Sequence, residues 1–207
     1  MFKINKKEPD YFKNAKRKIK SPKNSNAWSN PQISRIRLEL RKHILNNEQK
    51  CLCAYCERII RCDSNKSNID HFKTRNLFPQ ETLNYNNLLV SCNREDTCST
   101  FKDRNIKCKS DYDYIINPII ENPDDFLDYL LTGEIISKNC TPKAENTIKA
   151  FNLGTKEADK LVQHRKQITK TIIEKIDLSL GEILRNMNYE FQSFIINVYN
   201  KLKGEIT

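Results

Sequence analysis

Residues 51–103 read CLCAYCERIIRCDSNKSNIDHFKTRNLFPQETLNYNNLLVSCNREDTCSTFKD, and the rest of the chain is best understood from this stretch outward. It opens with the pair Cys53 and Cys56 and closes with the pair Cys92 and Cys98. A structural zinc ion takes four ligands in a tetrahedron, and two cysteines two residues apart turn both thiolates toward one ion. The two pairs therefore predict one zinc knuckle whose ligands come from both ends of the stretch, and a functional site formed by the residues between the pairs.

The ligand set has open alternatives, because the second pair is spaced more widely than the usual two to four residues. Cys51, Cys62 and Cys108 lie in or near the stretch and could replace any of the four ligands. Scattered buried cysteines without a metal are the other interpretation. Two close pairs favour zinc over that interpretation.

The chain contains eight cysteines and begins without an apolar secretory segment. Cysteines in a chain without a secretory segment indicate a reducing compartment, where a CxxC pair binds metal more often than it forms a disulfide. We therefore expect a cytoplasmic protein. No run of about 18 apolar residues is present, so no membrane span is expected.

Between the two cysteine pairs stands the step Ile69-Asp70-His71. An imidazole with an ordinary pKa of about 6.5 can take a proton from water at neutral pH. The carboxylate of Asp70 offers a hard oxygen to Mg²⁺ or Mn²⁺, and such an ion can support attack of the water on a phosphodiester. An Asp-His pair on a strand is usually a surface feature, and only its place inside the split knuckle favours catalysis.

Three further residues extend the candidate site. The amide of Asn87 could hold His71 in place, although asparagine is also an ordinary turn residue in the run 84–87. Lys102 and Arg104 fall on a helix expected after Cys98 and could bind a phosphate of the substrate. A solvated helical face explains these two cations equally well.

The net charge of +10 is concentrated in residues 1–50, which hold 14 Lys and Arg against 4 Asp and Glu. Residues 51–207 hold 22 of each sign. A basic segment with Tyr11, Phe12 and Trp28 suits contact with a nucleic-acid backbone, because neutralised phosphates release counterions. A solubilising or docking tail is the alternative.

The other elements follow from periodicity and from turn residues. An extended arm is expected over 1–30, and an amphipathic helix over 31–47 beginning at Asn30-Pro31. Two short strands are expected within 51–72 around a polar loop at 63–68, the second ending at His71. The expected order continues with a loop at 73–86, a short helix or strand at 86–90, and a helix opening at 98–100.

The C-terminal half is predicted to be mainly helical. A small hairpin is expected within 111–140 around Gly133. A helix over 142–153 should close at Gly154, which suits a C-cap. Thr155 should cap one long helix reaching Met187, and a last helix should cover 188–203.

The central motifs resemble the HNH, or ββα-metal, nuclease superfamily, and most closely the PtuB family of HNH subunits from Septu anti-phage systems, which also occur as retron effectors. The resemblance rests on Cys53-Ala-Tyr-Cys56-Glu57, Ile69-Asp70-His71-Phe72, the run Asn87 to Asn93 and the step Cys98-x-x-x-Lys102. It covers roughly residues 28–170.

This resemblance implies a metal-dependent DNA nuclease working with a PtuA-like ATPase subunit. His71 would be the general base, Asp70 a ligand of the catalytic Mg²⁺ or Mn²⁺, and Asn87 the residue that orients the base. The four cysteines of the two pairs would hold a structural zinc ion.

One departure from the superfamily pattern concerns the metal. Ser99 and Thr100 stand where a third His or Asn is usual, just after the last cysteine. A hydroxyl is a poorer ligand than imidazole or amide, so Asp103, one helical turn beyond Ser99, or a water could complete the set.

The expected fold class is α+β. A ββα-metal HNH core with a four-cysteine zinc knuckle would occupy 51–110, after a basic arm and helix at 1–50 and before a mostly helical region at 111–207 that docks the partner. Two other functions remain open: a zinc-knuckle nucleic-acid binding module without catalysis, and a structural adaptor. The sequence does not distinguish DNA from RNA as the substrate.

Overall fold

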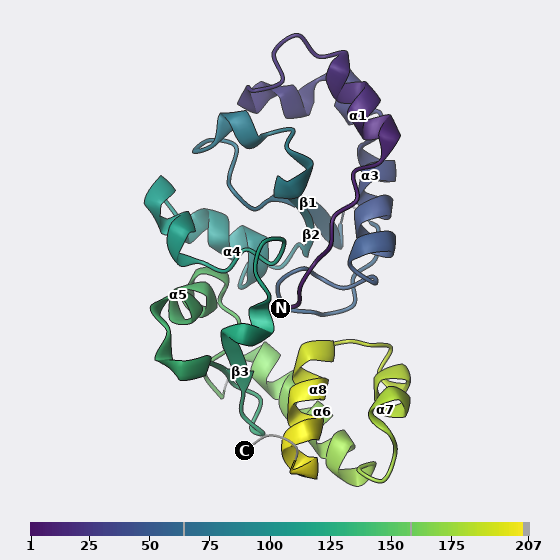
Figure 1. Ribbon diagram of the computed structural model, residues 1–207, viewed down its shortest axis with the longest axis vertical. Coiled ribbons are helices and arrows are strands. Elements are labelled where there is room, and N and C mark those ends of the chain that lie inside the picture. The colour runs from purple at the N-terminus through teal and green to yellow at the C-terminus, as the bar shows by residue number, and fades with distance from the viewer. Residues whose placement is uncertain (64, 158, 205–207) are drawn as a thin grey trace.

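The computed structural model describes residues 1–63, 65–157 and 159–204 (Figure 1). Ser64 in the expected polar loop, residue 158 in the expected long helix and residues 205–207 at the end of the expected helical region lie outside the described residues. In Figure 1 the helices α1 and α3 lie at one end of the molecule, the strands β1 and β2 lie near its middle, and α6, α7 and α8 lie at the other end.

The N-terminal segment is packed onto the protein, so the expected extended arm over 1–30 is wrong. Helix α1 covers Asp10–Arg17, and a 3₁₀ turn covers Ser25–Ser29. Phe12 and Ala15 lie three residues apart on one face of α1, and both are buried, as is Trp28. Burial of these apolar side chains outweighs the polar composition that suggested an arm.

The helical segment that follows starts where the sequence predicted. The side chain of Asn30 accepts a hydrogen bond from the amide of Gln32 at 2.9 Å, and Pro31 occupies the first helical position. The expected single helix is divided into α2 over Pro31–Ser34, α3 over Arg37–His43 and a π-helical turn over Ile44–Glu48. Leu40 and Ile44 still face the core.

The central sheet consists of two antiparallel strands, β1 over Ser67–His71 and β2 over Leu88–Cys92. The register pairs Ile69 with Val90 and His71 with Leu88. The other strand expected within 51–62 is reduced to a single bridge between Leu52 and Ile59. Helix α4, Cys98–Asn105, follows the strands, so the order is strand, strand, helix.

The second half of the chain combines a small hairpin with four helices. The hairpin joins β3 over Leu127–Tyr129 to β4 over Ile135–Ser137. The helices are α5 over Pro142–Phe151, α6 over Lys160–Glu174, α7 over Leu180–Asn186 and α8 over Gln192–Lys203. Short 3₁₀ turns cover Pro79–Glu81, Tyr85–Asn87, Lys109–Tyr114, Pro123–Asp125 and Lys138–Cys140.

Several helix boundaries differ from the prediction. Helix α6 begins at Lys160 after the N-cap residue Asp159, and not after Thr155. Helix α8 begins at Gln192 and not at 188.

Asn152, with a φ of 47°, takes the left-handed C-cap position of α5 that was expected at Gly154. The expected helix over 155–187 is interrupted because Ser179 and Glu182 form a capping box that starts α7.

The hairpin is fastened to α6 by Arg165. Its buried guanidinium donates to the carbonyls of Gly133, Leu153 and Gly154. Gly133 has a φ of 100°, and a β-carbon there would lie 2.5 Å from the carbonyl oxygen of Val162. This close approach explains the glycine in the turn.

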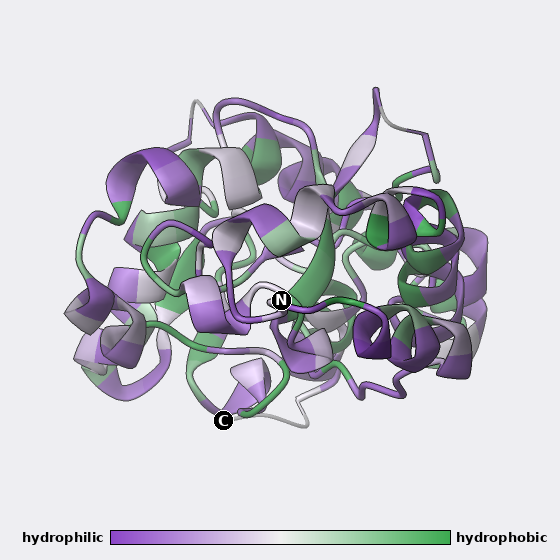
Figure 2. Ribbon diagram, turned by 90° about the horizontal axis from the view of Figure 1, so that it is seen from above, coloured by the Kyte–Doolittle hydropathy of each residue, from purple (hydrophilic) through white to green (hydrophobic). Residues whose placement is uncertain are grey.

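One cluster of buried apolar side chains runs through the chain and includes Phe12, Leu40, Tyr55, Phe151 and Phe194. Figure 2 shows hydrophobic segments concentrated inside the molecule and hydrophilic ones around its edge. Among the described residues, no helix has the length and apolar character needed to span a membrane.

Candidate functional site

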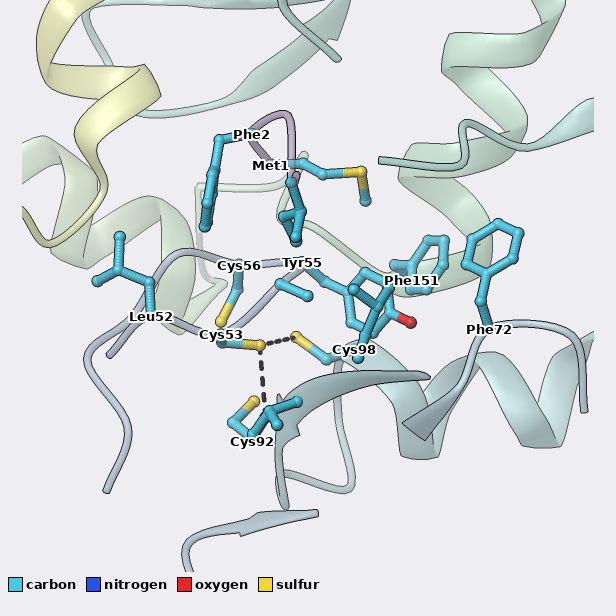
Figure 3. Close-up of a cluster of buried hydrophobic side chains, with 14 of the residues drawn as sticks. Met1, Phe2, Leu52, Cys53, Tyr55, Cys56, Phe72, Cys92, Cys98 and Phe151 are labelled. Atoms are coloured by element: carbon cyan, nitrogen blue, oxygen red, sulfur yellow. Dashed lines mark hydrogen bonds between the residues drawn. The ribbon is translucent and has the colours of Figure 1, made fainter. Parts of the chain in front are cut away.

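The four predicted cysteines come together. The sulfur atoms of Cys53, Cys56, Cys92 and Cys98 all lie within 4.8 Å of one another, and the four residues are buried (Figure 3). In the described part of the chain, these four form the one group of three or more His, Cys, Asp or Glu side chains suited to holding a metal ion.

The three alternative cysteine ligands do not join the cluster. Cys51 and Cys108 are exposed, and Cys62 is partly exposed. The four cysteines chosen from the sequence therefore lie together in one buried cluster, which could bind a metal such as zinc. Their role as ligands stays a prediction.

Three separate elements bring the sulfurs together. Cys53 and Cys56 lie in one turn, Cys92 ends β2 and Cys98 begins α4. The amide of Cys92 donates to Sγ of Cys53 at 3.3 Å. Burial alone would raise the pKa of the Cys53 thiol, but hydrogen bonds from the other three thiols lower it well below its usual value. The thiolate is the form of cysteine that binds zinc, and the other three thiols would also have to lose their protons when the ion binds.

His71 ends β1 and is buried, at 7% exposure. Its Nε2 lies 2.9 Å from the carbonyl oxygen of Thr82. Because a carbonyl oxygen only accepts, Nε2 of the neutral ring carries the hydrogen and Nδ1 keeps the lone pair. The ring also meets the ring of Trp28 edge to face, with 4.6 Å between the centroids.

Burial lowers the pKa of His71 to about 4. The Thr82 carbonyl and the Asp70 carboxylate oppose this effect, whereas the charges of Arg75 and Lys102 add to it. At neutral pH the imidazole is therefore unprotonated, as a general base must be.

Asp70 lies at the same end of β1, but its carboxylate is already occupied. Its two oxygens lie 3.1 and 3.0 Å from the ammonium of Lys102, and it accepts a hydrogen bond from the hydroxyl of Tyr55. The Asp70 side chain is only 4% exposed. As placed, Asp70 faces a cation of the protein itself.

Lys102 is fully buried and turned inward. Besides Asp70, its ammonium donates to the carbonyls of His71 and Phe72 at 2.8 and 2.9 Å and lies 3.2 Å from the carboxylate of Asp103. Burial would lower its pKa, but the two carboxylates raise it above the usual value. Lys102 thus remains charged and fixes the main chain at the end of β1 that carries His71.

The amide of Asn87 contacts the loop after His71 and not the imidazole. Its Oδ1 accepts from the amide of Lys73 at 2.7 Å, and its Nδ2 donates to the carbonyls of Lys73 and Glu81. Any orientation of His71 by Asn87 would therefore be indirect, through a loop that also presents the carbonyl of Thr82.

A polar cavity of about 450 Å³ opens beside His71. Strand β1, the loop after it and the end of α4 supply its walls. The lining residues are Asn68, Ile69, Asp70, His71, Thr74, Arg75, Asn76, Leu77, Asp103, Ile106 and Lys107.

The remaining predicted site residues are placed unequally around this cavity. Asp103 lines it, while Ser99 is buried and donates to Asn68 at 3.4 Å. Thr100 lies beside Ser99 on α4 and is not among the lining residues. Arg104 donates to the carbonyl of Glu95 and does not line the cavity.

Tyr55, Thr82 and Arg75 take part in the site but were not predicted from the sequence. Tyr55 lies between Cys53 and Cys56, so its proximity to the cysteine cluster could have been predicted from the sequence. Its hydrogen bond to Asp70 depends on the packing of two distant segments. Thr82 and Arg75 belong to an irregular loop, whose contacts have no periodic signal.

The protein is thus a mixed structure of helices and small sheets with a buried four-cysteine cluster, and a polar cavity lies beside a neutral histidine. No protein-family model matches the chain. It is 28% identical to Septu protein PtuB of Bacillus thuringiensis over 185 residues, which are 88% of this chain and 61% of that protein.

A second relative gives the same relation. The chain is 26% identical to Septu protein PtuB of Bacillus mycoides (strain KBAB4) over 165 residues, which are 68% of this chain and 55% of that protein. The chain therefore spans less than two thirds of the length of either relative. These similarities support a relation to Septu protein PtuB.

Proposed function

We propose that this protein is the nuclease component of an anti-phage defence system, hydrolysing phosphodiester bonds of DNA as an HNH endonuclease together with a PtuA-like ATPase. The observation that carries the proposal is His71, an unprotonated imidazole with one fixed tautomer at the wall of a polar cavity. The similarity to Septu protein PtuB supports the defence role.

The HNH assignment is supported by the order of the elements. Strands β1 and β2 are followed by α4, and the cysteines lie before β1, at the end of β2 and at the start of α4, in the order that the HNH resemblance implies. In that arrangement Nδ1 of His71 takes a proton from the attacking water. The carbonyl of Thr82 holds the ring, and the loop contacts of Asn87 keep that carbonyl in position.

Zinc fits the cysteine cluster. The four sulfurs have the number and closeness of a closed tetrahedral site, which would cross-link β2, α4 and the turn at 53–56. Such a closed site has no open position for a water or a substrate, so the proposed role of the zinc ion is structural.

The residues expected to bind the catalytic Mg²⁺ or Mn²⁺ are less well arranged for a metal ion than the cysteines are. The proposed ligand Asp70 faces the ammonium of Lys102, and Ser99 is bound to Asn68. Of the suggested additional ligands, only Asp103 lines the cavity, and it too is paired with Lys102. As arranged, these residues do not form a site for a divalent cation, although metal dependence remains the expectation from the HNH resemblance.

The same observation favours a second function, a zinc-knuckle module that binds nucleic acid without cleaving it. The ammonium of Lys102 occupies the place beside Asp70 that a catalytic metal ion would take, and Ser99 and Thr100 stand where an imidazole or amide ligand is usual. Both features are expected of a protein that has lost its catalytic metal ion. In that case His71 would be a structural residue.

The helical region at 111–207 is proposed as the docking surface for the ATPase. Several of its apolar side chains are exposed, and Ile173 on α6 is 52% exposed. Such side chains at the surface suit contact with a protein partner.

Cleavage of supercoiled plasmid tests the two functions against each other. The zinc-loaded chain, His71→Ala and the control His164→Ala would be assayed in Mg²⁺, in Mn²⁺ and in EDTA, each with and without the ATPase. His164 is an exposed histidine of α6, far from the cavity in the chain. The nuclease predicts a loss of about 10²–10⁴-fold in rate for His71→Ala alone.

Two other results would change the conclusion. Equal cutting by both histidine variants would exclude His71 as the base. Binding of DNA without cutting in any metal, with or without the ATPase, would favour the binding module.

A further inference from the structure

The cations that were expected to bind phosphate do not face the cavity. The ammonium of Lys102 is fully buried and fully occupied by carboxylates and carbonyls, and Arg104 is bound to the carbonyl of Glu95. A phosphate in the cavity beside His71 would therefore have to be held by other side chains.

Two other cations do line the cavity, Arg75 and Lys107. They belong to different elements, since Arg75 lies in the loop after β1 and Lys107 follows the end of α4. Their side chains therefore reach the cavity from two of its walls.

Neither side chain forms an ion pair among the described residues, although the charge of Arg75 acts on the carboxyl of Asp103 and opposes the rise that burial gives to its pKa. Among the described residues, their hydrogen bonds go to main-chain carbonyls: that of Ser25 at 3.4 Å for Arg75, and that of Asp103 at 3.3 Å for Lys107. Their charges are thus available to an anion in the cavity.

The charge around the cavity is positive when the buried Lys102 behind its wall is counted with the residues that line it. The carboxylates of Asp70 and Asp103 both face the ammonium of Lys102, at 3.0 and 3.2 Å. Arg75 and Lys107 add two further cations to this group of two acids and one lysine. An excess of positive charge beside a general base suits an anionic substrate.

The N-terminal segment contributes another arginine, Arg37, on the side of the molecule where Arg75 contacts Ser25. Arg37 donates to the carbonyl of Trp28 at 2.8 Å and lies over the Trp28 ring at 5.3 Å. Its Nε is buried without a hydrogen-bond partner. Burial lowers the pKa of Arg37, and the charges of Arg75 and Arg41 lower it further.

We propose that Arg75 and Lys107 are the residues that bind the phosphodiester backbone of DNA at this cavity, in place of Lys102 and Arg104. Each holds a phosphate by its charge, and the planar guanidinium of Arg75 can donate two parallel hydrogen bonds to one phosphate. Lys102 instead acts as a positioning residue behind the site. This inference rests on the proposed function, because it names how the same cavity takes a nucleic-acid strand.

The salt dependence of DNA binding tests the assignment without relying on cleavage. Zinc-loaded full-length protein would be titrated against a short fluorescein-labelled DNA duplex at rising salt, with anisotropy as the signal. Arg75→Ala and Lys107→Ala should each weaken binding and reduce the slope of log K against log salt by about 0.9. Arg104→Ala is the matched control, since it removes the same charge from a residue outside the cavity.

A conservative variant separates charge from folding. Arg75→Lys keeps the cation and should keep the salt slope of the wild type, although it loses the bidentate contact. An Arg75→Ala protein with an unchanged melting temperature and a reduced slope would support the assignment.

The opposite patterns are distinguishable. Wild-type slopes for Arg75→Ala and Lys107→Ala, with a reduced slope for Arg104→Ala, would overturn this inference and leave the proposed function standing. Absence of DNA binding by the wild type at every salt concentration, with and without the ATPase, would remove the proposed function, and this inference with it.

Discussion

Lys102 is a residue of the site whose ammonium makes several polar contacts at once. Its buried ammonium joins the carboxylate of Asp70 to the carbonyls of His71 and Phe72. A buried ion pair adds little net stability when both partners are compared with apolar residues, but removing one partner leaves the other charge without compensation. The position of His71 therefore depends on a residue that does not touch its ring.

We predict that Lys102→Met lowers the free energy of unfolding by about 3–5 kcal/mol, because Asp70 would remain buried and unpaired. Urea unfolding measures this. Lys107→Met, which removes an exposed lysine, should change stability by less than about 0.5 kcal/mol. Adding Asp70→Asn to Lys102→Met should recover part of the loss, and equal stability of Lys102→Met and wild type would contradict the paired arrangement.

His71 makes stability depend on pH. The folded protein keeps the ring neutral down to a pKa of about 4, whereas the unfolded chain binds a proton below about pH 6.5. Between these values the unfolded state binds more protons, so stability falls as the pH falls through this window. The full effect is on the order of 3 kcal/mol, from about 1.4 kcal/mol for each pKa unit.

The variant His71→Gln isolates this effect, because glutamine can still donate to the carbonyl of Thr82 but does not titrate. Urea unfolding at pH 7 and pH 5 should show a larger loss for the wild type than for His71→Gln. Any pH dependence of zinc binding is shared by both proteins, so equal losses would exclude His71 as the cause.

At the scale of elements, the cysteine cluster joins three pieces of local structure. The turn at 53–56, the end of β2 and the start of α4 each contribute sulfur, and Cys98 itself has a φ of 60°. Left-handed backbone at a non-glycine residue is held by its surroundings. Metal content and the position of α4 should therefore change together.

We predict that Cys98→Ala loses bound zinc and lowers the melting temperature by roughly 6–12 °C, the equivalent of about 3 kcal/mol for a chain of this size. Elemental analysis and a thermal scan measure the two quantities. Cys108→Ala removes an exposed cysteine outside the cluster and should change neither. Full zinc content in Cys98→Ala would show that the cluster is not the metal site.

What could be predicted from the sequence follows from how local each feature is. The CxxC turn is set by neighbouring residues, and the two cysteine pairs singled out in the sequence do lie together in one cluster. The partner of β1 was missed because β2 lies across a long loop, and the intervening residues carry no pairing signal. The inward orientation of Lys102 depends on Asp70, a residue 32 positions away, and no periodicity predicts it.

At the scale of the whole molecule, contacts cross both boundaries of the three segments predicted as 1–50, 51–110 and 111–207. The amide of Ile4 donates to the carbonyl of Pro118 at 2.8 Å, and the amide of Ser193 donates to Glu57 at 2.8 Å. The hydroxyl of Thr97 donates to the carbonyl of Phe151 at 2.9 Å. The segments share one core, and they need not be units that fold alone.

We therefore predict a single cooperative unfolding transition for the zinc-loaded chain, with equal calorimetric and van't Hoff enthalpies. Truncation after residue 154 should prevent folding, because it removes Arg165 from the carbonyls of Gly133 and Gly154. Two resolved calorimetric peaks, or a truncated chain with a cooperative melt, would indicate independent domains.

The edge-to-face contact between Trp28 and His71 has a practical consequence. Trp28 is the only tryptophan of the chain, and its ring also lies beneath the guanidinium of Arg37. Indole emission responds to nearby charge and to exclusion of water, so the intrinsic fluorescence of the protein reports on one place only. Protonation of the imidazole, or arrival of a DNA strand beside it, should become visible in the emission spectrum without any attached dye.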